Sequence, residues 1–415
     1  MSVRKRVWTT PKGEEKSAWV ADYLDAKGTR RLKTFKLKKH ADAFAATANV
    51  EVREGTHVAD SASITVAKAG DMWLASGEAN GLERSSIAQR KRHLALHIVP
   101  LIGPTLVSKI SVPAVRSFED ELRAKGTSAA MVKKLVVSLG SILSDAQERG
   151  LAAKNPVRDM KSRRGASGRR AEGRQKSRLT VGEDIPTPDE VRRILEAASG
   201  RWRPLLITAV FTGMRASELR GLRWQDIDFD ERTVRVRQRA DEYGIIGPPK
   251  SEAGIRDIPV PPIVVHTLRE WRLACPRRAT RRTDDTGKAA TELHLVFPNG
   301  LGKVENYKNI LRRGFGPVQI AAGVSVLSGK IDKEGQPILA GKYGGLHALR
   351  HFFASWCINR PRDGGLGLPL KVVQERMGHA TISMTGDVYG HLFPRADDAD
   401  EMAAAERALL MPHAT

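Results

Sequence analysis

The sequence is poor in cysteine and lacks long apolar runs, and each absence excludes a class of protein. Its two cysteines, Cys275 and Cys357, lie far apart. Two cysteines alone cannot supply the four ligands of a structural zinc site, and they indicate a reducing compartment rather than a disulfide framework. No run of about 18 apolar residues is present, so we expect no membrane span. The N-terminus MSVRKRVWTT is basic but no apolar segment follows it, and we therefore expect a cytoplasmic protein without a secretory signal.

Acidic residues are scarce relative to basic ones. The chain has 69 Lys and Arg against 47 Asp and Glu, which gives a formal net charge of +22. Such an excess attracts phosphate groups over long distances, so it favours a nucleic-acid partner over the alternative of a ribosome-associated or merely basic soluble protein. With 415 residues, the chain is too long for one ordinary domain and long enough for two or three.

The residue pattern divides the chain into successive blocks. We expect a small domain over residues 1–58, an all-helical domain over residues 62–157, a basic linker over residues 158–180 and a mainly helical domain with a small β-sheet over residues 181–415. The linker is rich in Arg, Gly and Ser and has almost no apolar residues, so it cannot build a core. The predicted fold class is therefore α+β and multidomain.

The first block has the pattern of a three-stranded sheet followed by a helix over residues 40–54. Apolar and aromatic residues mark the strands, and glycine-containing turns separate them. The strands also carry basic side chains, and a narrow β-ribbon can enter the major groove of DNA; a solvated basic face is the alternative. The DNA contacts expected here are Arg30, Arg31, Lys33 and Lys36.

Basic residues in the second block and in the linker are further candidates for DNA binding. Four helices are expected in the second block, and Arg90 and Lys91 on one of them either follow a phosphate backbone or lie on an exposed helix face. The charge of the linker predicts that it follows DNA rather than acting as a neutral spacer. Its candidate contacts are Arg163, Arg164, Arg169 and Arg170.

The third block begins with a capping box, TPDE at residues 187–190, that marks the start of a helix. A second helix or a helical pair, broken or bent near Gly213, follows, and then a hairpin whose strands flank GIIGPPKSEAG. We expect a surface loop over residues 274–291, a short buried strand in LHLVF and an inserted loop or hairpin over residues 323–345. The last helices are expected around LHALRHFFASWCI, LKVVQERMGH and SMTGDVY.

The residues able to carry chemistry are cationic rather than acidic. His-x-x-Arg occurs twice, beginning at His266 and at His347, so this pattern alone carries little weight. Breaking a phosphodiester without a metal requires a nucleophile, cationic donors to the non-bridging oxygens and a proton for the leaving oxygen. The sequence shows no acidic cluster suited to two Mg²⁺ ions, so we expect phosphoryl transfer with no metal and no cofactor.

Four segments occur in an order that resembles the successive motifs of the tyrosine recombinase (lambda-type phage integrase) family. They are TGMRASELRGLRWQDID, PPKSEAGIRDIPV, LHALRHFFAS and MGHATISMTGDVYGH. The resemblance matches in order, spacing and flanking apolar residues from Thr212 to His391. The catalytic residues that it implies are Arg215, Lys250, His347, Arg350, His379 and the nucleophile Tyr389. It also implies that Glu218 supports Arg215.

Several of these residues also have an ordinary structural interpretation. Arg215 could be a helix-surface arginine paired with Glu218, Lys250 an exposed turn lysine, and His379 a capping histidine after a helix. Tyr389 could, like most tyrosines, be partly buried with a bonded hydroxyl. As a nucleophile with an ordinary pKa of about 10, it would need nearby cations in order to ionise. Arginine suits the charge of a phosphate better than lysine because it can donate two hydrogen bonds at once.

The two His-x-x-Arg matches are expected to differ in role. His347 and Arg350 share one helix face, and His347 can act as an acid or a base near neutral pH. His351 lies beside this motif but is expected to point about 100° away on the helix. His266 and Arg269 follow a hairpin without the neighbouring pattern, so we interpret them as surface residues.

The resemblance also implies a reaction and an assembly. Attack by Tyr389 gives a covalent 3′-phosphotyrosyl link and a free 5′-hydroxyl, and a 5′-hydroxyl from a partner strand reverses the step without ATP. A homotetramer would act through a Holliday junction on double-stranded attachment sites, to integrate or excise a phage or mobile element on the nucleoid of a bacterial host. An accessory DNA-bending or excision factor is a further candidate partner.

The outer parts of the chain fit the same resemblance. The helical block is similar to a core-site DNA-binding domain, and the N-terminal sheet is similar to an arm-type DNA-binding domain. The final residues, EMAAAERALLMPHAT, have the pattern of a helix that docks on its own domain or on a neighbouring protomer. Three alternatives remain, namely a type IB topoisomerase-like enzyme, a catalytically inactive DNA-binding relative and a metal-dependent nuclease.

Overall fold

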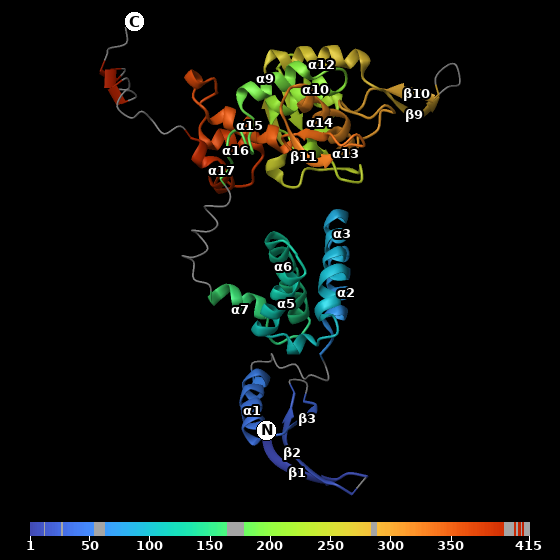
Figure 1. The fold of residues 1–415 in the computed structure, drawn as a ribbon, viewed down its shortest axis with the longest axis vertical. Helices are drawn as coiled ribbons and strands as arrows, with labels where there is room; N and C mark the ends of the chain where they lie inside the picture. The colour runs from blue at the N-terminus through green and yellow to red at the C-terminus, as the bar shows by residue number, and fades with distance from the viewer. Residues whose placement is uncertain are drawn as a thin grey trace. The chain divides into compact units, whose positions relative to one another are not determined.

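The computed structural model divides the chain into two compact units, residues 1–171 and residues 172–415 (Figure 1). No helix among the described residues has the length and apolarity needed to cross a membrane. The residues that the structure describes are 1–11, 13–25, 28–53, 63–163, 178–283, 289–393, 402–403, 406–407 and 409–410.

The first unit begins with an antiparallel three-stranded sheet, as the sequence predicts, with β2 as the central strand. Alternation along β2 buries Ala21 and Tyr23, and the Tyr23 ring meets that of Phe44 edge-on, with 5.7 Å between centroids. This contact fastens the following helix to the sheet. The elements are β1 (Ser2–Thr9), β2 (Glu15–Leu24), β3 (Arg30–Phe35) and α1 (Lys38–Arg53).

The described residues 63–163 of the first unit are mostly helical. Leu135, Leu139 and Ile142 recur at helical spacing along α6 and are fully buried, so this helix forms the centre of the helical core. The helix α7 crosses the boundary expected at residue 157. The helices are α2 (Val66–Ala79), α3 (Arg84–His93), α4 (Val99–Ile102), α5 (Val112–Ala124), α6 (Ala129–Glu148) and α7 (Pro156–Arg163), and a π-helical turn over Leu94–Ile98 joins α3 to α4.

The second unit is built around one large apolar core, to which α10 contributes a continuous buried run. The predicted capping box starts α9, because the Thr187 hydroxyl accepts from the Glu190 amide and the Glu190 carboxylate accepts from the Thr187 amide. The helices are α9 (Pro188–Ala197), α10 (Trp202–Thr212), α11 (Ala216–Gly221), α12 (Pro262–Ala274), α13 (Tyr307–Asn309), α14 (Gly316–Ala321), α15 (His347–Ile358), α16 (Leu370–Met377) and α17 (Ile382–Tyr389).

A small antiparallel sheet of order β4-β5-β8 contains the predicted hairpin. Its register places Val234 opposite Ile258 and Val236 opposite Arg256. Because Val234, Ile258 and Val236 are buried, this face of the sheet also turns Arg256 toward the interior. The strands are β4 (Ile227–Asp228), β5 (Thr233–Val236) and β8 (Arg256–Pro259), and the segment between β5 and β8 holds the short pair β6 (Arg239–Ala240) and β7 (Ile246–Gly247).

Residues 274–291 are not the plain surface loop that we expected. They contain β9 (Arg278–Thr283), which pairs with β10 (Ala289–Glu292) to form a hairpin. Threonines in both strands favour extended backbone, and an ion pair between Arg278 and Glu292 fastens the open end. The loop was expected because the segment is polar and basic, and this composition gave no sign of the strand pair.

Of the buried strand predicted in LHLVF and the loop or hairpin predicted over residues 323–345, the structure contains only the hairpin. LHLVF is largely buried, but its Leu295 forms an isolated bridge with Arg223 instead of a strand, because its neighbour is the short connection after α11. The expected strand is therefore wrong. The insertion over residues 323–345 takes the hairpin form of the two forms expected, with β11 (Ser325–Ile331) paired to β12 (Pro337–Gly341).

The break between α10 and α11 occurs at Gly213, whose φ of +57° places it in the left-handed region that favours glycine. A β-carbon built here would lie 2.4 Å from Cδ1 of Phe353. Both the backbone conformation and the close approach of α15 therefore require glycine at this position.

We expect Gly213→Ala to lower the free energy of unfolding by about 2–4 kcal/mol, because it combines left-handed strain with overpacking against Phe353. Urea denaturation followed by tryptophan fluorescence measures this change. Gly300→Ala is the matched control, since its β-carbon would meet nothing within 4 Å and its φ is not in the left-handed region. Equal midpoints for the two variants would contradict the assignment.

Candidate active site

The turn after Gly213 positions Arg215 at the start of α11. The backbone amide of Arg215 donates to Oε2 of Glu218 at 2.9 Å, and its Nη1 donates to Oε1 of the same carboxylate at 2.8 Å. Its Nη2 donates to the carbonyl of Gly378 at 3.1 Å. The side chain is still 35% exposed, so part of the guanidinium remains open to a ligand.

Glu218 is shared by two arginines and is almost fully buried. Besides Arg215, it accepts a hydrogen bond of 2.9 Å from Nη2 of Arg256, which reaches it from β8. Burial alone would raise the pKa of Glu218, but the charge and hydrogen bond of Arg256, together with Arg215, lower that pKa to about 2. The carboxylate is therefore ionised at any physiological pH and holds both guanidinium groups in place.

Arg350, on α15, is 2% exposed, and its hydrogen bonds go to backbone carbonyls rather than to a carboxylate. Nη1 donates to the carbonyl of Gly213 at 2.6 Å and Nη2 to that of Met377. Carbonyl oxygens satisfy the donors but do not cancel the charge. Burial, and then Arg215, lower the pKa of Arg350 from its usual range, and Glu218 acts in the opposite direction. The result is a buried positive charge beside the partly open Arg215.

His379 follows the C-terminal glycine of α16 and is buried. Its Nδ1 lies 2.9 Å from the hydroxyl of Thr385, and its carbonyl accepts from the side chain of Gln374 at 2.7 Å. These bonds fix the ring, and burial together with Arg350 lowers the pKa of His379 to about 4. The ring stacks on Tyr389, with planes 6° apart and 6.1 Å between centroids.

Tyr389 ends α17 and is 1% exposed. Its hydroxyl lies 2.7 Å from Nδ1 of His351. Burial raises the pKa of Tyr389 to about 12, although Arg350 and Arg215 act in the opposite direction. The hydroxyl is therefore protonated in this state, and its oxygen lies within hydrogen-bond distance of an imidazole nitrogen.

His347 and Lys250 are the more exposed of the predicted residues. His347 begins α15, and its ring meets that of His351 edge-on with 4.4 Å between centroids. Packing around the rest of the ring, with Arg350 and Arg215 nearby, lowers the pKa of His347. Lys250 lies on the exposed segment between β7 and β8. That segment is anchored to the site because Nη1 of Arg256 donates to the carbonyl of Gly254.

The structure thus brings together Arg215, Glu218, His347, Arg350, His379 and Tyr389. Lys250 lies on the exposed segment that precedes β8, and its catalytic role stays a prediction. Sequence reasoning missed Arg256 and the contact of His351 with Tyr389. His351 is four residues after His347, which puts both on one helix face, and this spacing was an available signal. The alternation along β8 could have indicated that Arg256 faces inward.

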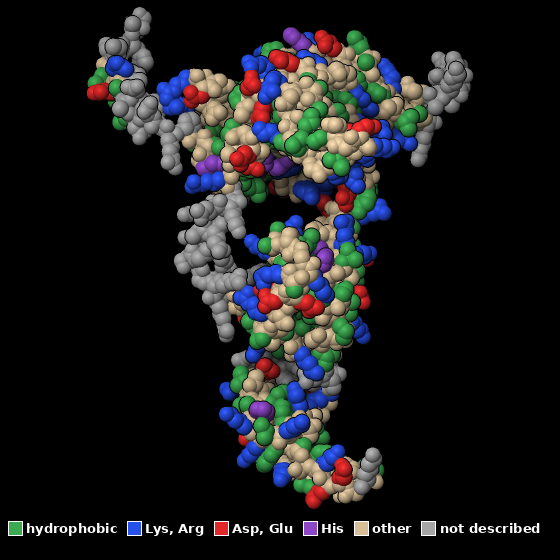
Figure 2. Space-filling view, in the orientation of Figure 1, with side chains coloured by type: hydrophobic (Ala, Val, Ile, Leu, Met, Phe, Trp, Pro, Cys, Tyr) green, Lys and Arg blue, Asp and Glu red, His purple; other side chains and the backbone are tan. Residues whose placement is uncertain are grey.

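The predicted DNA contacts of the N-terminal sheet lie on its surface, although most are engaged within the sheet. Arg30 donates to Asp22 at 2.5 and 2.9 Å, Arg31 donates to Asp25 at 2.9 Å, and the ammonium of Lys33 lies 4.4 Å from the ring centre of Phe44. Lys36 is exposed. Lys and Arg side chains are spread over the visible face of both units (Figure 2).

The other predicted contacts fall in the helical part and in the linker. Arg90 stacks on Trp73, with 4.2 Å from the guanidinium carbon to the ring centre, and Lys91 pairs with Glu78 at 2.9 Å. Arg163 ends α7, and its side chain is outside the described part of the structure. Arg164, Arg169 and Arg170 also lie outside the described residues.

We expect Glu218→Gln to lower the free energy of unfolding by about 3 kcal/mol at neutral pH, because it leaves Arg215 and Arg256 without their shared negative charge. Since the folded pKa of Glu218 is below its ordinary value, this stabilisation is complete above about pH 4.5 and is lost as the pH falls toward 2. Urea denaturation between pH 3 and pH 8 measures the difference between wild type and variant.

The matched control for this change is Glu252→Gln, at an exposed position on the segment that precedes β8. Its stability should stay close to that of the wild type across the range. A Glu218→Gln variant as stable as the wild type at pH 7 would show that the buried cluster does not hold the site together.

Residues 186–395, just over half of the chain, match the model of the phage integrase family. A tyrosine recombinase XerC-like protein of Caldanaerobacter subterraneus is 27% identical over 308 residues, which cover 70% of this chain and 69% of that protein. Both findings confirm the family predicted from the four motifs.

Solved structures share the fold. The Tn1549 transposon integrase in complex with transposon right end DNA is 21% identical, with a TM-score of 0.60 over 83% of this chain and 100% of that one. A lambda integrase tetramer bound to a Holliday junction is 16% identical, with a TM-score of 0.50 over 91% and 96%. These structures confirm the predicted α+β multidomain fold. The chain therefore belongs to the phage integrase family, whose members are tyrosine recombinases that break and rejoin DNA strands.

Proposed function

We propose that this tyrosine recombinase cleaves duplex DNA with Tyr389, forming a 3′-phosphotyrosyl link and releasing a 5′-hydroxyl. The observation that supports the proposal best is the buried guanidinium of Arg350, whose charge is bonded to carbonyls beside the partly exposed Arg215. A buried positive charge without a paired anion costs folding free energy, so this site favours an anion that neutralises the charge. A phosphodiester that entered here would meet both arginines, which can neutralise the charge that develops on its non-bridging oxygens.

We assign the remaining residues to contacts with the phosphate and to proton donation. His379 and His347 lie where neutral imidazoles would contact the phosphate oxygens, and their lowered pKa values keep them neutral near pH 7. Lys250 lies on an exposed segment that bound DNA could draw inward, and we assign it the proton for the leaving 5′ oxygen. The residues assigned to the reaction require no metal ligand, so cleavage should persist in excess EDTA.

We expect Tyr389→Phe to abolish SDS-stable protein–DNA adducts while leaving DNA affinity within about twofold, because only the nucleophilic oxygen is removed. Full-length protein is incubated with a pool of nicked random duplexes, which traps the cleaved state because the short 5′ strand diffuses away. Gel electrophoresis measures the adduct, and sequencing of the attached strand gives the cleavage site.

Tyr243→Phe is the control, because Tyr243 is an exposed tyrosine of the same unit. It should form adducts as the wild type does. Adducts that persist in Tyr389→Phe would contradict the assignment, and adducts through a 5′-phosphate would contradict the polarity of the reaction.

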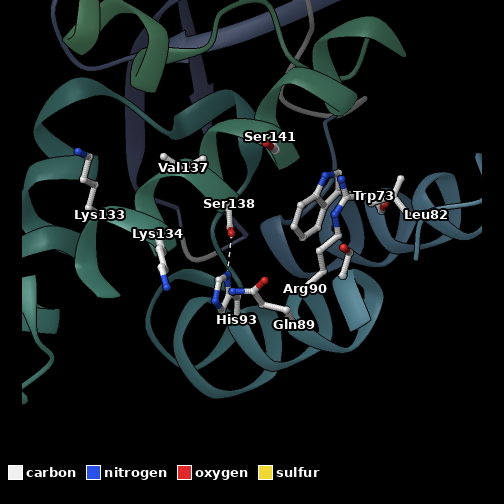
Figure 3. Close-up of a pocket in the computed structure, with 11 residues that line it drawn as sticks. Trp73, Leu82, Gln89, Arg90, His93, Lys133, Lys134, Val137, Ser138 and Ser141 are labelled. Atoms are coloured by element: carbon white, nitrogen blue, oxygen red, sulfur yellow. Dashed lines mark hydrogen bonds between the residues drawn. The ribbon is translucent and has the colours of Figure 1, made fainter. Parts of the chain in front are cut away.

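A groove of about 490 Å³ in the helical part of the first unit supports a second contact with DNA. Figure 3 shows its walls, where Arg90 stacks on Trp73 and buried His93 is bonded to Ser138 at 2.8 Å. These contacts fix the floor, while Lys133 and Lys134 on α6 line the groove as exposed side chains. Hydrogen-bonded polar groups beside exposed cations suit contact with a phosphate backbone. We therefore assign residues 62–157 to core-site DNA binding.

We expect the double change Lys133→Ala and Lys134→Ala to weaken binding to any duplex and to reduce the slope of log affinity against log salt by about 2, since each phosphate contact contributes about 0.9. Fluorescence anisotropy with a labelled random duplex measures both quantities. Lys125→Ala, an exposed lysine on another helix end, should leave the slope unchanged. An unchanged slope in the double variant would exclude this groove from the DNA interface.

The other segments and the oligomeric state can also be assigned by this proposal. We assign residues 1–58 to arm-type DNA binding, residues 158–180 to a basic linker and residues 181–415 to catalysis. The lambda integrase neighbour is a tetramer on a Holliday junction, and this supports a homotetramer on paired attachment sites in the cytoplasm of a bacterial host. Strand exchange between two duplexes tests this, whereas relaxation of supercoils without exchange would favour a type IB topoisomerase-like activity.

A further inference from the structure

The hydroxyl of Tyr389 has a hydrogen-bond partner that the family motif does not name. Nδ1 of His351 lies 2.7 Å from the hydroxyl oxygen, within the range for proton transfer along a hydrogen bond. His351 is on α15, one turn after His347, and Tyr389 ends α17, so two separate helices bring the pair together. A nucleophile bonded to an imidazole is the arrangement by which weak hydroxyl nucleophiles are activated.

We propose that His351 is the general base that takes the proton of Tyr389 during cleavage. As the Tyr389 oxygen forms its bond to phosphorus, its proton moves to Nδ1 of His351, and the bond from phosphorus to the 5′ oxygen breaks. Lys250 supplies the proton that this oxygen needs. In the reverse step His351 returns the proton to the tyrosine oxygen. The proposal rests on Tyr389 being the nucleophile.

The surroundings of His351 keep its ring neutral, so that Nδ1 has a free lone pair, and they give water access to the ring, so that the proton can leave. Burial, with His347 and Arg350, lowers the pKa of His351 to about 4, so Nδ1 can accept when Nε2 carries the ring proton. A cavity of about 250 Å³ beside the ring gives water access to it. The titratable and charged groups around this ring are Tyr389 on α17, His347 and Arg350 on α15, Glu183 and Asp184 before α9, and Lys342 and Tyr343 after β12.

Bound DNA should make this base stronger. A phosphate places negative charge near His351 and offsets the repulsion from Arg350, which raises the pKa of the imidazole toward neutrality. Asp184 acts in the same direction. The base therefore gains strength when the substrate is in place, and near neutral pH it remains unprotonated before the reaction.

The test compares His351→Asn with His351→Ala in full-length protein. Asparagine places an amide near the position of Nδ1 and keeps a hydrogen bond to Tyr389, but it cannot take up a proton. If His351 is the base, both variants lose about 10²–10⁴-fold in single-turnover cleavage of the nicked duplex identified by adduct sequencing. Their log rates should then rise with pH with a slope near 1, because hydroxide replaces the base, whereas the wild type stays flat.

Two rescue experiments separate the base from the acid. Added imidazole should restore part of the cleavage by His351→Ala and none by Tyr389→Phe. A substrate with sulfur at the 5′ bridging position leaves without a proton, so it should restore Lys250→Ala but leave His351→Ala slow. His266→Ala, at the exposed histidine of the second His-x-x-Arg match, is the control and should cleave at the wild-type rate.

Wild-type cleavage by His351→Asn would overturn the proposal, because it would show that a hydrogen bond suffices. Equal losses in both variants with a flat pH profile would also overturn it, in favour of packing. A faster His351→Ala would show that His351 restrains the tyrosine instead. If the wild type itself formed no adduct, the proposed function would fail, and this outcome is distinct from all the others.

Discussion

The C-terminal end of α16 presents three consecutive carbonyls, those of residues 376–378, to arginines from three other elements. Arg256 on β8, Arg350 on α15 and Arg215 at the start of α11 each donate to one of them. The last carbonyls of a helix lack partners within the helix and carry partial negative charge, so they suit buried guanidinium groups. The final turn of α16 therefore fixes where three positive charges lie, and the next residue after it is His379.

This arrangement leaves the site short of negative charge. Glu218 compensates Arg215 and Arg256, whereas Arg350 is bonded to carbonyls. Holding like charges together costs folding free energy, and a buried carboxylate with a pKa of about 2 offsets only part of that cost. A bound phosphate would supply the missing charge and would stabilise the folded state, by an amount that grows with the logarithm of its affinity. Under the proposed function, the same deficit of negative charge favours the binding of an anion.

The sequence predicted the candidate site residues that belong to motifs, and it missed the groups that reach the site only through packing of distant segments. Arg215, His347, Arg350, His379 and Tyr389 were identifiable from their order along the chain, as were the capping box of α9 and the break at Gly213, because each depends on local patterns. The three carbonyls were not, since they are defined by where α16 ends in space. The contact of His351 with Tyr389 was missed because Tyr389 lies 38 residues away along the chain. The β9–β10 hairpin was missed because its sequence is polar and basic, as in a surface loop.

The burial of Tyr389 links the chemistry to DNA binding. A phenol with a pKa of about 12 stays protonated at neutral pH, so, with Tyr389 as the proposed nucleophile, the free protein would hold almost no phenolate to attack DNA that it meets by chance. Arg350 and Arg215 favour ionisation of Tyr389 but do not outweigh its burial. Under the proposed mechanism, attack therefore requires the phosphate, the paired arginines and the proton acceptor His351 at the same time. Such a requirement would add selectivity to a basic chain, because binding to DNA alone would not ionise the proposed nucleophile.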